Sequence, residues 1–227
     1  MERSEAETVL SAVEERMASD PAAGLKGSGF WKVVSAAKQS PDLAMEFAGR
    51  IAAIDRTAFE RWAMLTVPLG VGTIAALVGT VVGLVLVGLV YSTPDPWNGV
   101  VLLAGAGVML VTTHGLAHLV VGRLAGIRFT HWFIGTIAQP QPGVKTDYAT
   151  YLTTAARRRA WMHASGALMT KILPFALLPA ALIAGVPNWA TVLLVVVGVV
   201  SIITDILWST KVGDWKKFRR EMSLTKP

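Results

Sequence analysis

The chain alternates between long apolar runs and short polar connections after a polar N-terminal segment. Four of the runs are long enough to cross a bilayer, because a helix needs about 20 apolar residues to span the hydrocarbon core. The expected spans are residues 63–91, 98–124, 160–184 and 189–208. This pattern predicts an all-α polytopic membrane protein with a membrane domain of four helices over residues 62–210.

The polar segment 1–61 carries apolar residues at helical spacing and therefore predicts short amphipathic helices. Ser40 followed by Pro41 is typical of a helix start, because Ser caps the helix and Pro fits its first turn. We expect these helices to cover the cytoplasmic ends of the spans. The alternative is an anchor on a membrane surface or a partner, but frequent acidic residues do not favour a basic lipid-binding helix.

Composition supports the membrane class and excludes several others. The chain is 53% hydrophobic and 16% charged, whereas a soluble domain is about 25% charged. It has no cysteine, which excludes disulfides and thiolate metal sites. The net charge of +6 comes without a basic patch of interleaved aromatics, so we expect loops that face an anionic leaflet and no nucleic-acid partner.

The distribution of Lys and Arg predicts the orientation in the membrane. The connections 92–98 and 186–188 contain neither residue, whereas 1–61, 128–159 and the basic tail 211–227 are rich in them. Because cytoplasmic segments carry the positive excess, both termini are expected to be cytoplasmic. The connection 128–159 is expected to be cytoplasmic or membrane-dipping, and the location to be a bacterial or archaeal cell membrane.

The second predicted span contains the most informative residues, His114 and His118. Residues four apart lie on one face of a helix, and ionisable residues inside a span are functional candidates because they are costly there. A helical His-x-x-x-His pair is typical of a zinc site, usually as H-E-x-x-H with Glu as the general base. Gly115 occupies the position of that Glu, so the pattern predicts a metal site without its base.

Counting residues at ~1.5 Å per residue places other polar groups at a similar depth. His118 lies ~8 Å, Asp205 ~9 Å and His163 ~6 Å inside the cytoplasmic boundary, with His114 somewhat deeper. Two histidines and a carboxylate form a catalytic-type zinc set with a fourth position for water. Alternatively these residues hydrogen-bond between helices, and an ion pair with Lys171 takes Asp205 away from a metal.

The segment 114–127, read as HGLAHLVVGRLAGI, resembles the site-2 protease family of intramembrane zinc metalloproteases. The family pattern is close to H-E-x-x-H-x-x-x-A-R-x-x-G-I. Both histidines, Arg123 and Gly126 match this pattern, and Gly122 stands where a small Ala is usual.

The resemblance has further implications for the rest of the chain. It implies a membrane-dipping hairpin from 133 to 148 and a third zinc ligand at Asp205. The stretch 164–170, which includes Gly166, is similar to the family's Ala-Gly-Pro-Leu-x-Asn segment with Pro and Asn replaced. Because that segment helps to bind substrate in the family, its changes count against peptide-bond cleavage.

Three functions remain open at this point. The first is an inactive relative that binds a membrane partner or client as a regulatory or assembly subunit, with zinc allowed. The second is an active zinc metalloprotease with a relocated base, for which His163 is a weak candidate. The third is a purely structural membrane protein without metal. The loss of the base at Gly115 favours the first, since a positioned acid–base group contributes roughly 10²–10⁴-fold to rate.

Overall fold

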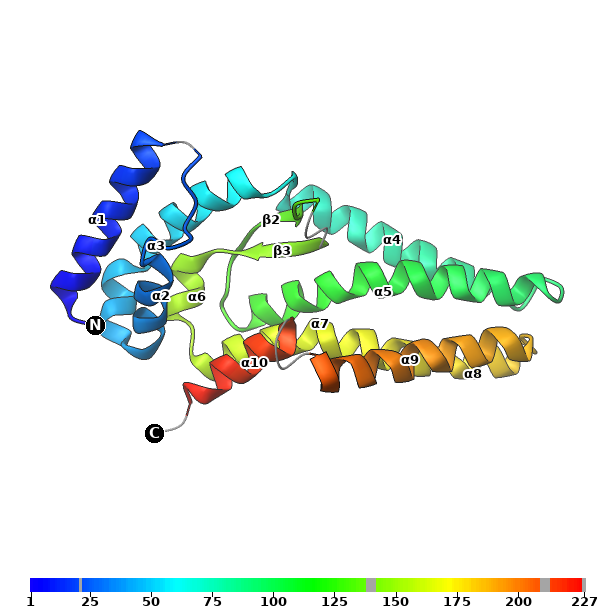
Figure 1. Cartoon of the computed structure of the whole chain (residues 1–227). Coiled ribbons are helices and arrows are strands. Elements are labelled where there is room, and N and C mark those ends of the chain that lie inside the picture. The colour runs from blue at the N-terminus through cyan, green and yellow to red at the C-terminus, as the bar shows by residue number, and fades with distance from the viewer. Residues whose placement is uncertain (21, 138–141, 209–212, 226–227) are drawn as a thin grey trace. The chain divides into compact units, whose positions relative to one another are not determined.

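The computed structural model describes the chain except for residues 21, 138–141, 209–212 and 226–227 (Figure 1). Among the described residues, four helical segments are long and apolar enough to cross a membrane. They are Leu69–Leu89, Trp97–Leu124, Ala156–Ile183 and Asn188–Leu207. The prediction of a mainly helical, membrane-embedded protein is confirmed at this level.

The chain divides into two compact units, which are described separately. The N-terminal unit comprises residues 1–69, 122–159 and 222–227. The membrane unit comprises residues 70–121 and 160–221. Every residue of the candidate site described below belongs to the membrane unit.

Three helices lie in the first part of the N-terminal unit. They are α1 (Arg3–Ser19), α2 (Phe30–Gln39) and α3 (Pro41–Trp62). The start of α3 is the predicted one, because the Ser40 hydroxyl accepts a hydrogen bond from the backbone N–H of Leu43. The apolar faces meet in a core in which Leu10, Phe30 and Ile51 have no exposed surface. Amphipathic spacing in the sequence therefore produces a packed helical layer.

The N-terminal unit contains a small antiparallel sheet, of which the resemblance implied only a hairpin over residues 133–148, a range that the structure describes except for 138–141. Its strands are β1 (Leu65–Pro68), β2 (Phe129–Ile134) and β3 (Pro142–Thr146), in the order β1-β2-β3, followed by α6 (Tyr148–Thr153). Val67 pairs with Trp132, which in turn pairs with Val144. The first span therefore begins at Leu69 and not at 63, because residues 65–68 pair with β2. An apolar run of this length fits a strand as well as a span, so hydropathy does not separate them.

Ion pairs join elements of the N-terminal unit that are distant in sequence. Arg50 on α3 contacts Glu7 at 2.5 Å and Glu14 at 2.6 Å, both on α1. Asp55 on α3 lies 2.5 Å from Lys145 on β3, and both side chains are largely buried. Burial raises the pKa of the Asp55 carboxyl, although the charge of Lys145 lowers it in part. These ion pairs therefore connect α3 with α1 and with β3.

Glycines on the first span allow two helices of the membrane unit to approach closely. This unit contains α4 (Leu69–Leu89), α5 (Trp97–Leu124), α7 (Ala156–Ala176), α8 (Leu178–Ile183), α9 (Asn188–Trp208) and α10 (Asp214–Ser223). A Cβ on Gly79 would lie 2.7 Å from Thr112, and one on Gly83 would collide with Met109. The Thr80 hydroxyl also donates to the Thr112 hydroxyl at 2.8 Å. Small residues at a helix interface are the usual device for close packing in a membrane.

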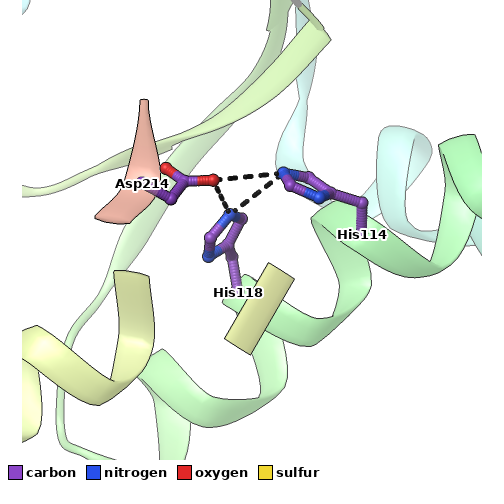
Figure 2. Close-up of side chains that lie close together, drawn as sticks. All are labelled: His114, His118 and Asp214. Atoms are coloured by element: carbon purple, nitrogen blue, oxygen red, sulfur yellow. Dashed lines mark hydrogen bonds and ion pairs between the residues drawn. The ribbon is translucent and has the colours of Figure 1, made fainter. Parts of the chain in front are cut away.

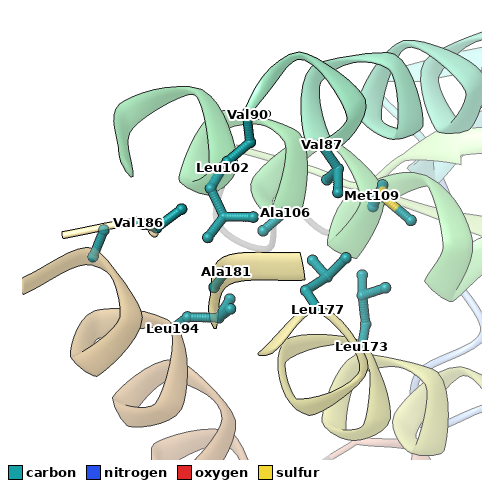
Figure 3. Packing of buried hydrophobic residues seen from close by; sticks show 11 residues of the cluster. Val87, Val90, Leu102, Ala106, Met109, Leu173, Leu177, Ala181, Val186 and Leu194 are labelled. Atoms are coloured by element: carbon teal, nitrogen blue, oxygen red, sulfur yellow. The ribbon is translucent and has the colours of Figure 1, made fainter. Parts of the chain in front are cut away.

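The membrane unit is apolar both inside and outside. Its core cluster includes Leu102, Leu173 and Leu194 from three different helices (Figure 3). Large hydrophobic side chains are also exposed on α4 and α9, such as Ile74 at 64% and Ile203 at 47%. Lipid is as apolar as these side chains, so outward-facing aliphatic residues carry no penalty in a bilayer. Polar residues within the spans are therefore the ones that need an explanation.

Candidate metal centre

The two histidines of α5 point their ring nitrogens toward one place (Figure 2). His114 Nε2 and His118 Nε2 lie 3.2 Å apart, and the rings are nearly perpendicular. Their four-residue spacing puts them one above the other on the same helix face. The structure therefore brings together the pair that the sequence singled out.

A carboxylate from beyond the four spans completes the group. Asp214, the first residue of α10, places its Oδ2 3.1 Å from His118 Nε2 and 3.4 Å from His114 Nε2. Its other oxygen lies 3.3 Å from Lys217 Nζ. The two Nε2 atoms and Asp214 Oδ2 are named the His–His–Asp triangle here.

The outer nitrogen of each histidine is held by an acceptor from α7. His118 Nδ1 lies 2.7 Å from the Met162 carbonyl oxygen, which can only accept, so Nδ1 carries the proton. His114 Nδ1 lies 2.9 Å from the Thr170 hydroxyl, which donates its own proton to the Gly166 carbonyl. Both histidines therefore donate from Nδ1 and direct Nε2 into the triangle (Figure 2). Such outer partners are typical of metal-binding histidines.

The geometry of the triangle fits a zinc ion. A tetrahedral zinc with bonds of about 2.0–2.1 Å sets its ligand atoms roughly 3.3 Å apart. The three edges measure 3.1, 3.2 and 3.4 Å. Three electron-rich atoms this close require positive charge between them, either a metal ion or a proton on one imidazole. Imidazole and carboxylate are common zinc ligands, and three of them leave a fourth position open.

Burial and charge favour an ionised carboxylate at the centre. Burial raises the pKa of Asp214, but its contacts with both histidine rings and the charge of Lys217 lower it more. The net effect holds the pKa of this carboxyl well below its usual range, so the side chain is negatively charged at neutral pH. The side chain of His118 is 12% exposed and that of His114 is 35% exposed. The triangle is therefore open on the His114 side.

Gly166 on α7 permits the close approach of α7 to the histidines. A Cβ at this position would lie 2.7 Å from both Cδ2 and Cε1 of His118. Only glycine allows a ring to rest against the backbone in this way. Its carbonyl also receives the Thr170 hydroxyl that orients His114. The resemblance had singled out Gly166 by motif, and its contacts give it a physical role.

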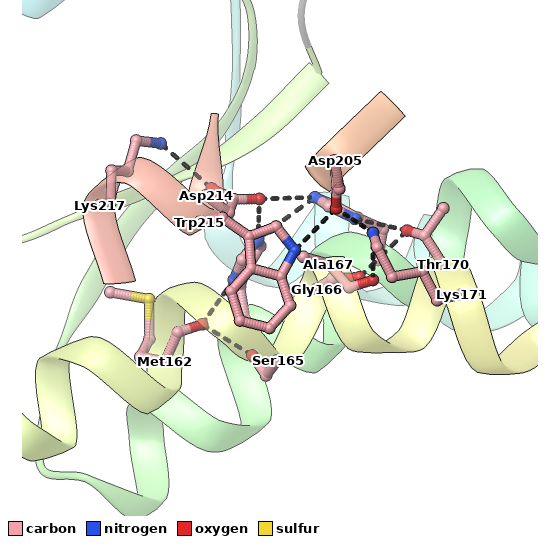
Figure 4. Close-up of polar contacts among 12 residues, drawn as sticks. Met162, Ser165, Gly166, Ala167, Thr170, Lys171, Asp205, Asp214, Trp215 and Lys217 are labelled. Atoms are coloured by element: carbon pink, nitrogen blue, oxygen red, sulfur yellow. Dashed lines mark hydrogen bonds and ion pairs between the residues drawn. The ribbon is translucent and has the colours of Figure 1, made fainter. Parts of the chain in front are cut away.

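Asp205, the predicted third ligand, does not belong to the triangle. Its Oδ2 forms an ion pair with Lys171 and accepts a hydrogen bond from Trp215 Nε1 at 2.7 Å (Figure 4). The alternative considered from the sequence, a Lys171–Asp205 pair, is therefore the arrangement found. An ammonium group in an apolar span needs a counter-charge, and Asp205 supplies it. The group that the structure brings together, and that could hold a metal ion, is His114, His118 and Asp214.

The remaining predicted site residues lie around the triangle or away from it. Gly115 is buried on α5 directly after His114 and brings no side chain to the site. His163 is half-buried on α7, next to Met162, and contributes no atom to the triangle. Arg123 is exposed in the last turn of α5.

Depth in the membrane, counted in residues from the end of each span, did not point to Asp214 because this residue lies beyond the fourth span. The sequence assigned 211–227 to a basic tail, whereas residues 214–223 form the helix α10. Lys211, which marked the expected end of the span, lies outside the described residues. Gly213 adopts a left-handed φ of 100° immediately before Asp214. Glycine is typical of turns, so Gly213 is the local signal directly before Asp214.

No protein-family model, curated protein or solved structure matches this chain. The resemblance to the site-2 protease family therefore rests on the sequence motif around His114 and stays a prediction. The function has to be argued from the site itself.

Proposed function

We propose that this chain is an integral membrane protein that binds one zinc ion through His114, His118 and Asp214 and does not cleave peptide bonds. It acts as a partner-binding, regulatory or assembly subunit within the membrane. The observation that carries the proposal is the His–His–Asp triangle, with edges of 3.1–3.4 Å and both Nε2 atoms directed inward.

The residue after His114 argues against proteolysis. Bound zinc lowers the pKa of a coordinated water and polarises a carbonyl. A proton must still be moved, and a positioned acid–base side chain contributes roughly 10²–10⁴-fold to that. Gly115 has no side chain for this task, although the ligands beside it fit the metal. A chain that can hold the ion without moving a proton is suited to binding.

The membrane setting supports a partner that is itself a membrane protein. Four apolar helices place the site-bearing unit in the bilayer. We infer that both termini are cytoplasmic, because Lys and Arg concentrate in 1–61, in 128–159 and in the C-terminal segment. The partner is then a membrane protein whose apolar segment packs beside the spans.

A zinc hydrolase is the second candidate, and the open side of the triangle favours it. Catalytic zinc sites have three protein ligands and an open fourth position, and His114 is 35% exposed. In that case another residue serves as the base, and His163 on α7 is the weak candidate that the sequence offers. Turnover of model transmembrane peptides distinguishes the two functions. Cleavage that needs zinc and disappears in Asp214→Ala would overturn the non-catalytic proposal.

Metal content tests the proposal directly. The full chain is purified in detergent without chelator, and zinc per chain is measured by elemental analysis. We expect one zinc in the wild type and none in His118→Ala or Asp214→Ala. Asp42→Ala, which removes an exposed acid on α3, serves as the control and keeps the metal. A wild type that neither carries zinc nor takes it up in a titration would contradict the proposal.

Placing a general base at position 115 tests whether the site lacks only this group for peptide cleavage. In Gly115→Glu a carboxylate stands where the resembling family has its general base. If the site is otherwise intact, this variant gains zinc-dependent cleavage of a transmembrane peptide, and the wild type shows none. Gly107→Glu on the same helix is the control, because it adds a carboxylate away from the triangle.

A further inference from the structure

Asp205 lies at the centre of a second polar cluster beside the triangle (Figure 4). Its Oδ2 is paired with Lys171 of α7 and accepts the indole N–H of Trp215 on α10 at 2.7 Å. The Lys171 ammonium also donates to the Ala167 carbonyl at 3.1 Å. One carboxylate oxygen on α9 therefore joins three helices.

The indole held by Asp205 belongs to the residue that follows Asp214. Asp214 and Trp215 are the first two residues of α10, and each reaches a fixed partner in the membrane unit. Adjacent residues of a helix point about 100° apart around its axis, since a turn has 3.6 residues. Both contacts can be made together only at one rotation and one position of α10. The Trp215–Asp205 hydrogen bond thereby fixes where Asp214 Oδ2 lies.

We propose that Asp205 is a positioning residue for the metal centre, which holds Trp215 and so sets Asp214 against the two histidines. Lys171 neutralises Asp205 and orients its carboxylate toward the indole. This inference rests on the proposed function, because it assigns a role within the same metal site. It gives the acid of the fourth span a purpose other than metal ligation.

Ring packing offers a competing account of how α10 is placed. Phe218 of α10 packs against Trp161 of α7, with ring centroids 5.6 Å apart, and against Trp215 at 5.4 Å. If these contacts alone fixed α10, a phenyl ring at position 215 would serve as well as an indole. The two accounts therefore differ in what the N–H of Trp215 contributes.

Zinc affinity of the full chain in detergent distinguishes them. Zn²⁺ is titrated against a competing chromophoric chelator for the wild type, Trp215→Phe and the double variant Asp205→Leu/Lys171→Leu. Removing both charges together avoids leaving an unpaired ammonium in the span. We expect both variants to bind zinc at least about tenfold more weakly, within the ~10–100-fold typical of outer-shell partners. The stoichiometry at saturation stays at one, because all three ligands remain.

Trp161→Phe is the matched control. It makes the same indole-to-phenyl change beside the same Phe218 ring, on a side chain that does not contact Asp205. We expect its zinc affinity to equal that of the wild type. A loss in Trp161→Phe as large as in Trp215→Phe would favour ring packing and overturn the inference.

A readout without metal tests the contact itself. The indole N–H resonance of Trp215 is identified in the NMR spectrum of metal-free protein by its absence in Trp215→Phe. We expect it to be shifted downfield by the carboxylate and to move upfield in the double variant. An unchanged resonance would show that Asp205 does not hold the indole and would overturn the inference.

The outcomes separate this inference from the proposed function. A wild type that binds no zinc overturns the metal site and, with it, any positioning role. Zinc binding by the wild type with unchanged affinity in both variants overturns the positioning role alone. Complete loss of zinc in the double variant with no effect of Trp215→Phe would make Asp205 a ligand, again against the inference.

Discussion

The two units use charged residues in opposite ways. In the N-terminal unit, ion pairs such as Arg50 with Glu14 join helices that already share a large apolar core. In the membrane unit, Asp205, Lys171, Asp214 and the histidines gather in two adjacent clusters within a largely apolar unit. Water can replace a lost partner at the exposed pairs of the first unit, whereas lipid cannot in the second. Exposed ion pairs therefore stabilise the first unit incrementally, but polar contacts within the second unit indicate a site.

The largest effect on stability is expected at the buried pair of the N-terminal unit. Asp55→Ala leaves the Lys145 ammonium buried without its partner, which costs about 3–5 kcal/mol of that unit's stability. Amide hydrogen exchange of the full chain in detergent measures this cost across α3 and β3. Arg56→Ala is the control, since the Arg56–Asp147 pair spans 3.7 Å with Arg56 exposed and is worth about 0–1 kcal/mol. Equal effects of the two variants would mean that Asp55 behaves as a surface residue.

The same isoleucine-to-alanine change distinguishes the core of the N-terminal unit from the lipid-facing surface of the membrane unit. Ile51→Ala removes a fully buried side chain of the N-terminal unit and is expected to cost about 2–5 kcal/mol. Ile74→Ala removes the same atoms from a side chain that is 64% exposed on α4. Lipid or detergent fills that space, so little change in exchange or thermal unfolding is expected. A comparable loss in Ile74→Ala would indicate that another surface covers this face of α4.

Gly166→Ala tests how tightly α7 holds the metal site. The added methyl group collides with the His118 ring and turns its Nε2 away from the triangle. We expect zinc affinity to fall by about 10–100-fold, the range seen when an outer contact of a ligand is lost. Gly107→Ala is the matched control, because a Cβ there meets nothing within 4 Å. Unchanged zinc binding in Gly166→Ala would mean that the ring can move aside at no cost.

The smallest effect concerns the helix start at Ser40. Ser40→Ala removes the hydroxyl that accepts the N–H of Leu43 and should cost about 1 kcal/mol. Hydrogen exchange at the first turn of α3 reports this loss, while zinc binding stays unchanged. Ser40→Thr, which keeps the hydroxyl, should recover most of the stability. No difference between the two variants would place the start of α3 under the control of packing alone.

The sequence by itself determined the class of protein and the location of its chemistry. Runs of about 20 apolar residues can satisfy their backbone only as helices in lipid, so four spans followed from hydropathy. The spacing of His114 and His118 put both rings on one helix face, because helix geometry is local. The cap at Ser40 was readable for the same reason.

Tertiary structure alone decided which acid meets the histidines. Asp205 and Asp214 differ little as residues, and depth in the membrane favoured the first. The choice depends on Lys171, which pairs with Asp205, and on the position of α10, whose first residue Asp214 contacts His118 of α5. The pairing of β1 with β2 was likewise not visible in the sequence, since the first two spans separate Val67 from Trp132 along the chain. Such contacts join residues far apart in sequence, and local patterns carry no information about which distant partner is chosen.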